Sequence, residues 1–304
     1  MNLWGIITKT RIMLLNIAFL LSMAGICQAQ ETKKGKLEAD ANAMPVIKYL
    51  WYGFDLLDIR RGLEGKISVD VSATVQSKYM WHGFDLYGDH GVFMPAVGVT
   101  LGDTGFSGKY IRAYPLSSGF EKFKEAHYAV FYSGAFLKDT RYATNFTTNY
   151  FYHSLPEFMR HKSDTQEVGS TFFWPKLIAV GDGYITPSYY LGYMWASRSN
   201  ANASARGCEG FIHVFGLAYD LTAPDFWAAG KNQTFRLSGD ITYNDGFFSS
   251  AIEHGWSHAT LGISTDFKKG NLTITPSLNY QISMEDSVNN EEEVWCELNV
   301  TYRF

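Results

Sequence analysis

The sequence predicts an all-β fold: a transmembrane antiparallel β-barrel of about 12 strands, with 10 or 14 strands as the alternatives. Three observations support this prediction. Apolar and polar residues alternate with a period of two over segments longer than the five or six residues of an average globular strand. In each segment, alternate residues share one face of the predicted strand, and we call each such set a parity. Aromatic residues gather near the strand ends on the apolar parity, whereas the polar parity carries charges. Residues 294–304 form one more such strand, and the chain ends on its aromatic Phe304.

The N-terminal residues 1–29 are predicted to be a secretory signal peptide. Lys9 and Arg11 precede an apolar run over residues 12–26, and Ala29 supplies a small residue at the cleavage position. A membrane-spanning helix needs about 20 apolar residues, so this run is too short to be an anchor. Export from the cytoplasm is therefore expected.

Composition limits the class of protein. With 46% hydrophobic and 16% aromatic residues, the chain is not expected to be disordered. Its formal net charge of -4 falls to about -6 without Lys9 and Arg11, so no nucleic-acid partner is expected. Cys208 and Cys296 remain in the mature chain, and both a disulfide and two unpaired cysteines are compatible with their positions. No spacing of cysteine and histidine indicates a metal site, and no cofactor is expected.

Residues 30–65 are predicted to be an N-terminal periplasmic segment or plug. Within them, residues 49–56 have the sequence Tyr-Leu-Trp-Tyr-Gly-Phe-Asp-Leu, and residues 79–86 repeat it as Tyr-Met-Trp-His-Gly-Phe-Asp-Leu. The repeat indicates either a duplicated ligand-contacting element or plug, or a coincidence in a chain rich in aromatic residues.

The barrel is predicted to occupy residues 66–304. Most of its strands show a continuous apolar parity and an equally continuous polar one, and the turn Gly-Asp-Thr-Gly at 102–105 is typical of a hairpin. Pro187 is a blemish in its predicted strand, because proline cannot donate to a strand ladder. The predicted strands are 66–82, 92–102, 106–114, 126–136, 142–152, 166–174, 185–195, 211–221, 234–244, 258–267, 272–282 and 294–304.

The connections between these strands sort by length. Short turns at 102–105, 138–141 and 268–271 alternate with longer loops. In an outer-membrane barrel, the short turns face the periplasm and the long loops face outward. Two turns on the periplasmic side, 175–183 and 223–233, are longer than this rule prefers, and they leave the alternatives of 10 or 14 strands open. The long loops are 153–164, 197–205, 244–255 and 285–292.

The charges on the polar parity favour a membrane barrel over a soluble one, because a soluble barrel would bury them. The following residues are predicted to line the lumen: Asp70, Lys78, His82, Arg236, Asp240, Asp266, Glu297 and Arg303. If the first and last strands pair, Asp70 meets Arg303 and Lys78 meets Glu297 at nearly the same register. Arg236 and Asp266 form a similar predicted pair on adjacent strands.

A resemblance rests on the segment Ser-Lys-Tyr-Met-Trp-His-Gly-Phe-Asp at residues 77–85. Its positions Ser77, Tyr79, Trp81 and Gly83 resemble a motif that ends the first strand in a family of uncharacterised Gram-negative outer-membrane β-barrel proteins. Lys78 and His82 depart from that motif, which usually has an acid and an arginine there. The resemblance implies a location in the bacterial outer membrane, with its lipid as a partner.

The C-terminal Tyr-Arg-Phe also resembles the closing strand of such barrels. This second resemblance implies that Tyr302 and Phe304 form an assembly signal for the barrel-assembly machinery.

The function expected from the polar parity is a passive channel or porin for small solutes. The alternative is a structural or adaptor barrel with a closed lumen, and an outer-membrane lipid hydrolase is a further alternative. His254 and His258 flank Gly-Trp-Ser, but the sequence shows neither an orienting carboxylate nor a G-x-S-x-G elbow. Enzymatic activity is therefore not expected, and His82 and His90 lack the spacing of metal ligands.

Overall fold

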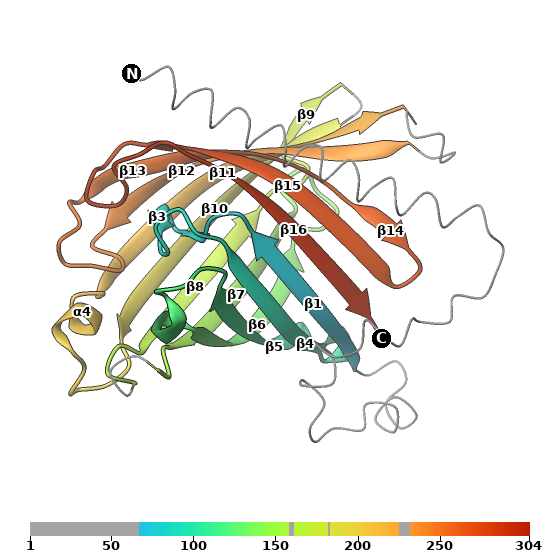
Figure 1. Ribbon diagram of the computed structural model, residues 1–304. Coiled ribbons are helices and arrows are strands. Elements are labelled where there is room, and N and C mark those ends of the chain that lie inside the picture. Colours follow the sequence, from blue (N-terminus) through green and yellow to red (C-terminus); the bar gives the residue numbers. More distant parts are fainter. Residues whose placement is uncertain (1–66, 158–160, 182, 225–231) are drawn as a thin grey trace, which may run out of the picture. The chain divides into compact units, whose positions relative to one another are not determined.

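The computed structural model describes residues 67–157, 161–181, 183–224 and 232–304, which form a closed antiparallel β-barrel (Figure 1). The predicted signal peptide 1–29, the segment 30–65 and the first copy of the repeat, 49–56, lie outside the described residues. The sheet has 14 strands, but β9 (Ile178–Val180) and β14 (Phe267–Lys269) have only 3 residues each, so twelve strands form the wall. The predicted strand number is confirmed.

The wall strands follow one another around the barrel in chain order. Each pairs with the next, and pairing of the first with the last closes the ring, so no wall strand has an unpaired edge. They are β1 (Ser68–Gln76), β4 (Val92–Thr100), β5 (Phe106–Pro115), β6 (Glu125–Phe136), β7 (Thr144–Ser154), β8 (Thr165–Phe173), β10 (Gly183–Ala196), β11 (Gly210–Ala223), β12 (Gln233–Asp245), β13 (Gly255–Thr265), β15 (Leu272–Ser283) and β16 (Glu293–Arg303).

The closing seam has the predicted register. Asp70 of β1 lies opposite Arg303 of β16, and Gln76 lies opposite Glu297. The sheet hydrogen bonds continue past both strand ends, where the Phe304 N–H donates to the Val69 carbonyl at 2.9 Å. A shift by one residue would turn every polar side chain of β16 onto the apolar face, so the alternating pattern fixes this register.

The two faces of the wall differ in chemistry. On β6, Tyr128, Val130 and Tyr132 are exposed, whereas His127 and Ala129, which alternate with them, are buried. Exposed aromatic residues pair across strands on the outer face, such as Tyr110 with Tyr128 at a ring-centroid distance of 5.1 Å. The barrel is therefore apolar outside and polar inside, opposite to a soluble protein.

The connections divide the barrel into two ends. The end named here the turn end carries 101–105, 137–143, 174–182 and 266–271. At 105 the turn needs a positive φ of 82°, which glycine adopts without strain. The other end, named the loop end, carries 77–91, 116–124, 155–164, 197–209, 246–254 and 284–292, with the 3-10 helix η3 (Glu121–Phe123) and the helix α4 (Ala203–Arg206). Residues 174–182 include only the short β9, so this longer turn conceals no spanning strand.

One predicted strand is wrong at its end. The pattern predicted a strand over 66–82, but β1 leaves the wall after Gln76. The hydrogen-bonded ladder with β16 ends at Ser77, whose N–H donates to the Cys296 carbonyl and whose Oγ accepts from the Cys296 N–H, both at 2.9 Å. Beyond it, Tyr79 and Trp81 alternate like wall residues but are held by contacts inside the barrel.

No helix among the described residues is long and apolar enough to cross a membrane. Cys208 and Cys296 are both free thiols, so no disulfide joins them.

Candidate functional site

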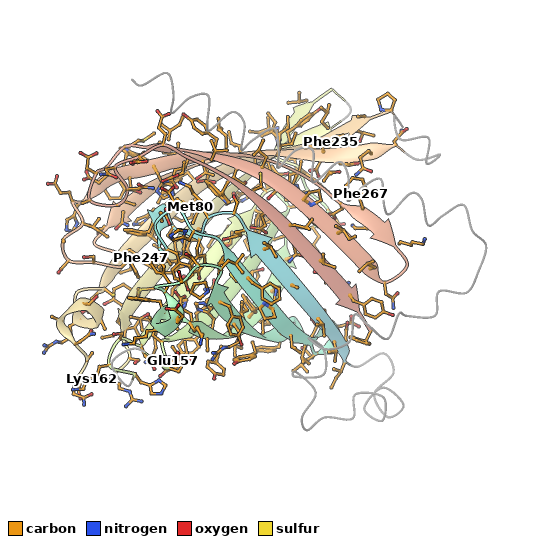
Figure 2. The ribbon with its side chains drawn as sticks, in the orientation of Figure 1. Met80, Glu157, Lys162, Phe235, Phe247 and Phe267 are labelled. Carbon is orange, nitrogen blue, oxygen red and sulfur yellow. The ribbon has the colours of Figure 1, made fainter. Side chains whose placement is uncertain are left out.

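Residues 77–91 fold back into the barrel at the loop end, and we name this segment the plug. It contains β2 (Met80–Trp81) and β3 (Phe84–Asp85), a hairpin in a separate two-stranded sheet. His82 and Gly83 form its tip, with positive φ angles of 48° and 92°. Figure 1 shows β3 inside the ring of strands near the end that carries α4, and Figure 2 labels Met80 and Phe247 in that part of the view. Trp81, next to Met80 in β2, contacts Phe247 at a ring-centroid distance of 5.7 Å.

One side of the plug binds the wall formed by β13, β15 and β16. The Gln281 Nε2 donates to the Gly83 carbonyl at 2.9 Å, and Gln281 is 1% exposed. The ammonium of Lys78 forms an ion pair with Glu293 of β16. Phe84 packs in a buried cluster with Ile252 and Val288 of the surrounding loops.

The other side of the plug contacts β6, β7 and β10. The Tyr79 hydroxyl donates to Glu125 Oε2 of β6 at 3.2 Å. Trp81 meets His153 of β7 at a ring-centroid distance of 5.6 Å, and His82 stacks on Tyr190 of β10 at 6.1 Å. Because β6–β10 and β13–β16 are separate arcs of the wall, the plug crosses the lumen.

A chain of polar side chains lies under the plug on the inner face of β6, β7 and β8. His127 Nδ1 and His153 Nδ1 are 2.8 Å apart. The Nε2 atoms of these two histidines lie 3.1 Å from carboxylate oxygens, Glu125 for His127 and Glu167 for His153. Tyr190 extends the chain by donating its hydroxyl to Glu167.

Hydrogen-bond chemistry explains why these four side chains lie together. In each Nε2 contact, the ring nitrogen and the carboxyl oxygen share one proton, and the contact between the Nδ1 atoms of His127 and His153 needs one donor and one acceptor. This pairing satisfies groups that would be costly to bury alone.

His82 lies near the centre of this environment. Burial lowers the pKa of His82, Glu167 opposes the shift, and His153 adds to it. His258 of β13 lies beside the tip of the plug, since an added Cβ at Gly83 would overlap the His258 ring. The docked plug thus favours a neutral His82.

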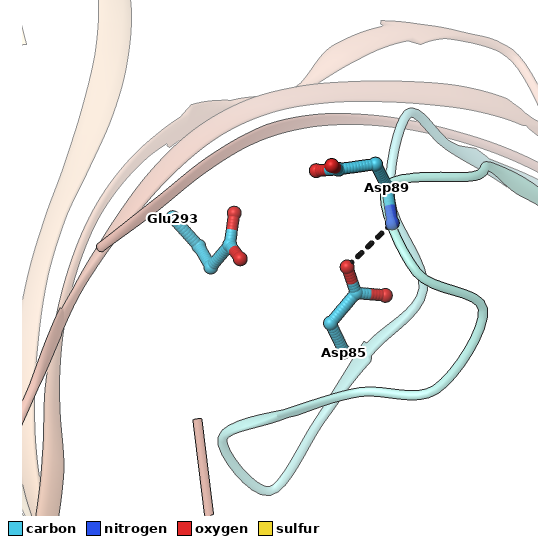
Figure 3. A group of neighbouring side chains, drawn as sticks. All are labelled: Asp85, Asp89 and Glu293. Atoms are coloured by element: carbon cyan, nitrogen blue, oxygen red, sulfur yellow. Dashed lines mark hydrogen bonds between the residues drawn. The ribbon is translucent and has the colours of Figure 1, made fainter. Parts of the chain in front are cut away.

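Lys78 is held by acidic groups on the plug and on the wall. Burial disfavours its charge, but bonds to Asp89 and Glu293 outweigh that effect and raise the pKa of Lys78. Figure 3 shows Asp85 and Asp89 on the plug facing Glu293, with Asp85 Oδ2 accepting from the Asp89 N–H at 2.6 Å. Among the described residues these three carboxylates are close enough to hold a metal ion, with ligand atoms within 4.8 Å of one another. The Lys78 ammonium already bonds Asp89 and Glu293, so a side chain of the protein offsets part of the negative charge of this cluster.

The histidines singled out for a hydrolase have different partners. His254 bonds Asp245 at the loop end, and His258 Nδ1 lies 2.9 Å from Ser257 Oγ. Ser257 is fully buried at a bulge of β13, and it also contacts the Thr242 carbonyl at 3.3 Å. In the described part of the chain, no carboxylate bonds His258, so the third group of a catalytic triad is not assembled around this serine.

The predicted lumen residues fall into two groups. By register, Asp70, Arg236, Asp240, Glu297 and Arg303 share the inward parity of their strands. Of the other predicted lumen residues, Lys78 and His82 lie in the plug, and Asp266 lies in the turn before β14, where Thr275 Oγ1 donates to it at 2.7 Å.

None of the three predicted ion pairs forms among the described residues. Asp70 and Arg303 lie opposite each other in the ladder, but no ion pair joins their side chains. Lys78 pairs with Glu293 and Asp89 because the chain leaves the wall before residue 78, and Glu297 accepts from Gln76 Nε2 at 2.7 Å instead. Arg236 forms a two-pronged ion pair with Asp220 of β11, at 2.8 and 2.9 Å, because Asp220 lies directly opposite it in the ladder.

The inward side chains of β12 change from exposed to buried between the turn end and the loop end. Its inward residues Arg236 and Ser238 are exposed, Asp240 is intermediate, and Thr242 and Asn244 are buried. Neighbouring inward positions toward the turn end hold small residues. They are Ser188, Gly216, Gly262, Ser264 and Ser277. Side chains of this size leave space inside a 12-strand barrel, so the described inward side chains fill the loop-end half of the lumen, under the plug, more completely than the turn-end half.

Several residues of the site were not predicted. Glu125, His127, His153, Glu167 and Glu293 were outside the predicted set. Glu125 and Glu293 each precede a predicted strand by one residue, and His153 was assigned to a loop. A charged or histidine residue at the loop-end terminus of a strand was the only available signal.

The four residues on which the motif resemblance was based belong to the plug and its attachment. Ser77 bonds β16, Tyr79 bonds β6, Trp81 contacts β7, and Gly83 provides the tip and a carbonyl acceptor. At the C-terminus, Tyr302 and Phe304 are both exposed, and their rings lie 4.9 Å apart.

No protein-family model matches this sequence, and no curated protein sequence matches it. Solved structures of outer-membrane proteins have a similar fold. The NanC porin is 11% identical, with 77% of this chain and 98% of the porin covered and a TM-score of 0.44. An outer membrane channel from Pseudomonas putida F1 is 9% identical, with 80% and 97% covered and a TM-score of 0.45. LpxR from Salmonella typhimurium is 7% identical, with 77% and 99% covered and a TM-score of 0.43.

Proposed function

We propose that this protein is a channel of the bacterial outer membrane for small polar solutes, and that the plug controls its outer mouth. The change from exposed to buried inward residues along β12 carries the proposal. A lumen kept wet by small and charged side chains over half its length serves passage, whereas a purely structural barrel has no need of it.

The membrane location is supported by the outer face. Exposed residues such as Val130, Leu217 and Leu261 are more than half exposed and would face lipid. With the loop end outward, long loops face the exterior and short turns face the periplasm. The plug is then the first external connection, folded inward.

A second candidate function is a structural barrel with a closed lumen. The contacts of the plug with both sides of the wall favour it, because they obstruct the loop end in this state. The two functions differ in the behaviour of the plug: in a channel it leaves the lumen at times, whereas in a structural barrel it stays docked.

Conductance of the refolded mature chain in planar bilayers distinguishes them. The wild type is compared with a variant in which residues 79–86 are replaced by a Gly-Ser linker of equal length, and with a variant lacking residues 30–65. Heat-modifiable gel migration verifies that each barrel has folded.

A channel obstructed by the plug gives larger or more frequent current steps in the 79–86 variant than in the wild type. Two folded but silent barrels would refute the channel and favour the structural candidate. A gain confined to the variant lacking 30–65 would assign the obstruction to that segment instead.

A further inference from the structure

Among the described residues of the wall strands, one arginine lies on the lipid-facing side. On β5, Tyr110 lies opposite Tyr128 of β6, which is 51% exposed, so the parity of Tyr110 is the outward one. Arg112 and Tyr114 continue that parity, whereas Ala113 between them is fully buried. Arg112 therefore points outward, three residues before Pro115 ends the strand at the loop end.

The surroundings of Arg112 are aromatic. Its guanidinium carbon lies 5.4 Å from the centroid of the Tyr114 ring, and it interacts with the hydroxyls of both Tyr110 and Tyr114. Tyr110 in turn packs on Tyr128. Tyrosines at this level are typical of the membrane interface, where the ring contacts lipid and the hydroxyl meets the headgroups.

The charge of Arg112 has no anion within the described residues. No carboxylate there lies within ion-pair distance of its guanidinium, and its buried Nε–H has no hydrogen-bond acceptor. The one arginine ion pair described for the wall, Arg236 with Asp220, is inward. An uncompensated cation on the lipid face of a barrel is costly, and the cost falls toward the interface, where headgroup anions are within reach.

We infer that Arg112, with the hydroxyls of Tyr110 and Tyr114, forms an external site for the phosphate of an outer-leaflet lipid headgroup. A guanidinium presents paired N–H donors that match phosphate oxygens, and phenolic hydroxyls can donate to the remaining oxygens. The tyrosine rings meanwhile contact the first carbons of the acyl chains. The site is separate from the plug and the lumen.

Native mass spectrometry of the detergent-solubilised barrel tests the site with lipid A as the probe, in its phosphorylated form and with its phosphates removed. The wild type should retain the phosphorylated form preferentially. Arg112→Gln should lower that retention by about tenfold, because a charge-assisted bond is lost, and Arg112→Lys should restore part of it. Lys109→Gln is the matched control, since Lys109 lies on the same strand with the inward parity.

Equal retention by the wild type and by Arg112→Gln would overturn the site. So would equal loss in Arg112→Gln and Lys109→Gln, which would indicate net charge alone. Full competition by inorganic phosphate, with no preference for the lipid, would show a general anion site and would refute the lipid. Because lipid retention is measured without any current, the result stands independently of the proposed channel.

Discussion

Substituting Gly83 with alanine should drive the plug out of the barrel without damaging the wall. The residue has a φ of 92°, and its carbonyl accepts the hydrogen bond from Gln281. An added Cβ would overlap the ring of His258, which is itself held by Ser257. The ring cannot move away without breaking that bond, so the plug must give way.

The free-energy cost of docking the plug in Gly83→Ala is the sum of three terms. A side chain at positive φ costs about 1–2 kcal/mol, overpacking against a fixed ring costs about 1–3 kcal/mol, and a weakened hydrogen bond costs about 0.5–1.5 kcal/mol. Gly88 offers a matched control. It also lies in the plug with a positive φ of 54°, but nothing lies within 4 Å of an added Cβ. Gly88→Ala thus carries only the first term.

The last two terms separate the two variants and sum to about 3 kcal/mol at their midpoints, or roughly a 150-fold change in the ratio of docked to released plug. Single-channel recording measures it as open probability, and heat-modifiable migration confirms that both barrels fold. Gly83→Ala should open far more often than Gly88→Ala and the wild type. Equal open probabilities in the two variants would refute the reasoning, because only Gly83 contacts the wall.

The remaining predictions concern charge. Because the docked plug lowers the pKa of His82 below its ordinary 6.5, the released plug binds more protons below that pH. Docking should weaken as pH falls from 7.5 to 5, conductance should rise, and an unchanged pH response in His82→Gln would contradict this. Lys78→Met and Glu293→Gln should be coupled in a double-mutant cycle of urea unfolding by about 1–3 kcal/mol, since both side chains are largely buried. A second cycle that combines Lys78→Met with Glu297→Gln should show no coupling. A coupling energy equal to that of the first cycle would instead support the pair of Lys78 with Glu297 that the sequence suggested.

Much of the wall could be predicted from sequence because its physics is local. Alternation with a period of two identifies a strand and its faces, and an even number of strands follows from closure. The seam register was predictable too, since Asp70 and Arg303 must both face inward at the two ends of a ring. Side-chain partners were less predictable. The ladder allows several inward neighbours, and Arg236 has Asp220 directly opposite but Asp266 only beyond the end of the adjacent strand.

The plug could not be predicted because its pattern imitates the wall. Tyr79 and Trp81 continue the apolar parity of β1, so the sequence indicates one long strand. What removes them from the wall is a set of partners distant in sequence, including Glu125, His153 and Gln281. No alternation rule encodes contacts that cross a lumen. For the same reason the polar chain of His127 and His153 emerged only when neighbouring strands were aligned.

Lys78 and His82 each have partners in the barrel that suit their chemistry. Lys78 meets the acids Asp89 and Glu293. His82 enters a buried site against Tyr190 of β10. Burial disfavours a permanent cation there, whereas a neutral imidazole is accommodated. Both side chains are therefore matched to the wall that receives them. The match makes docking of the plug dependent on pH through His82, while Lys78 anchors its base at any pH where Glu293 is ionised.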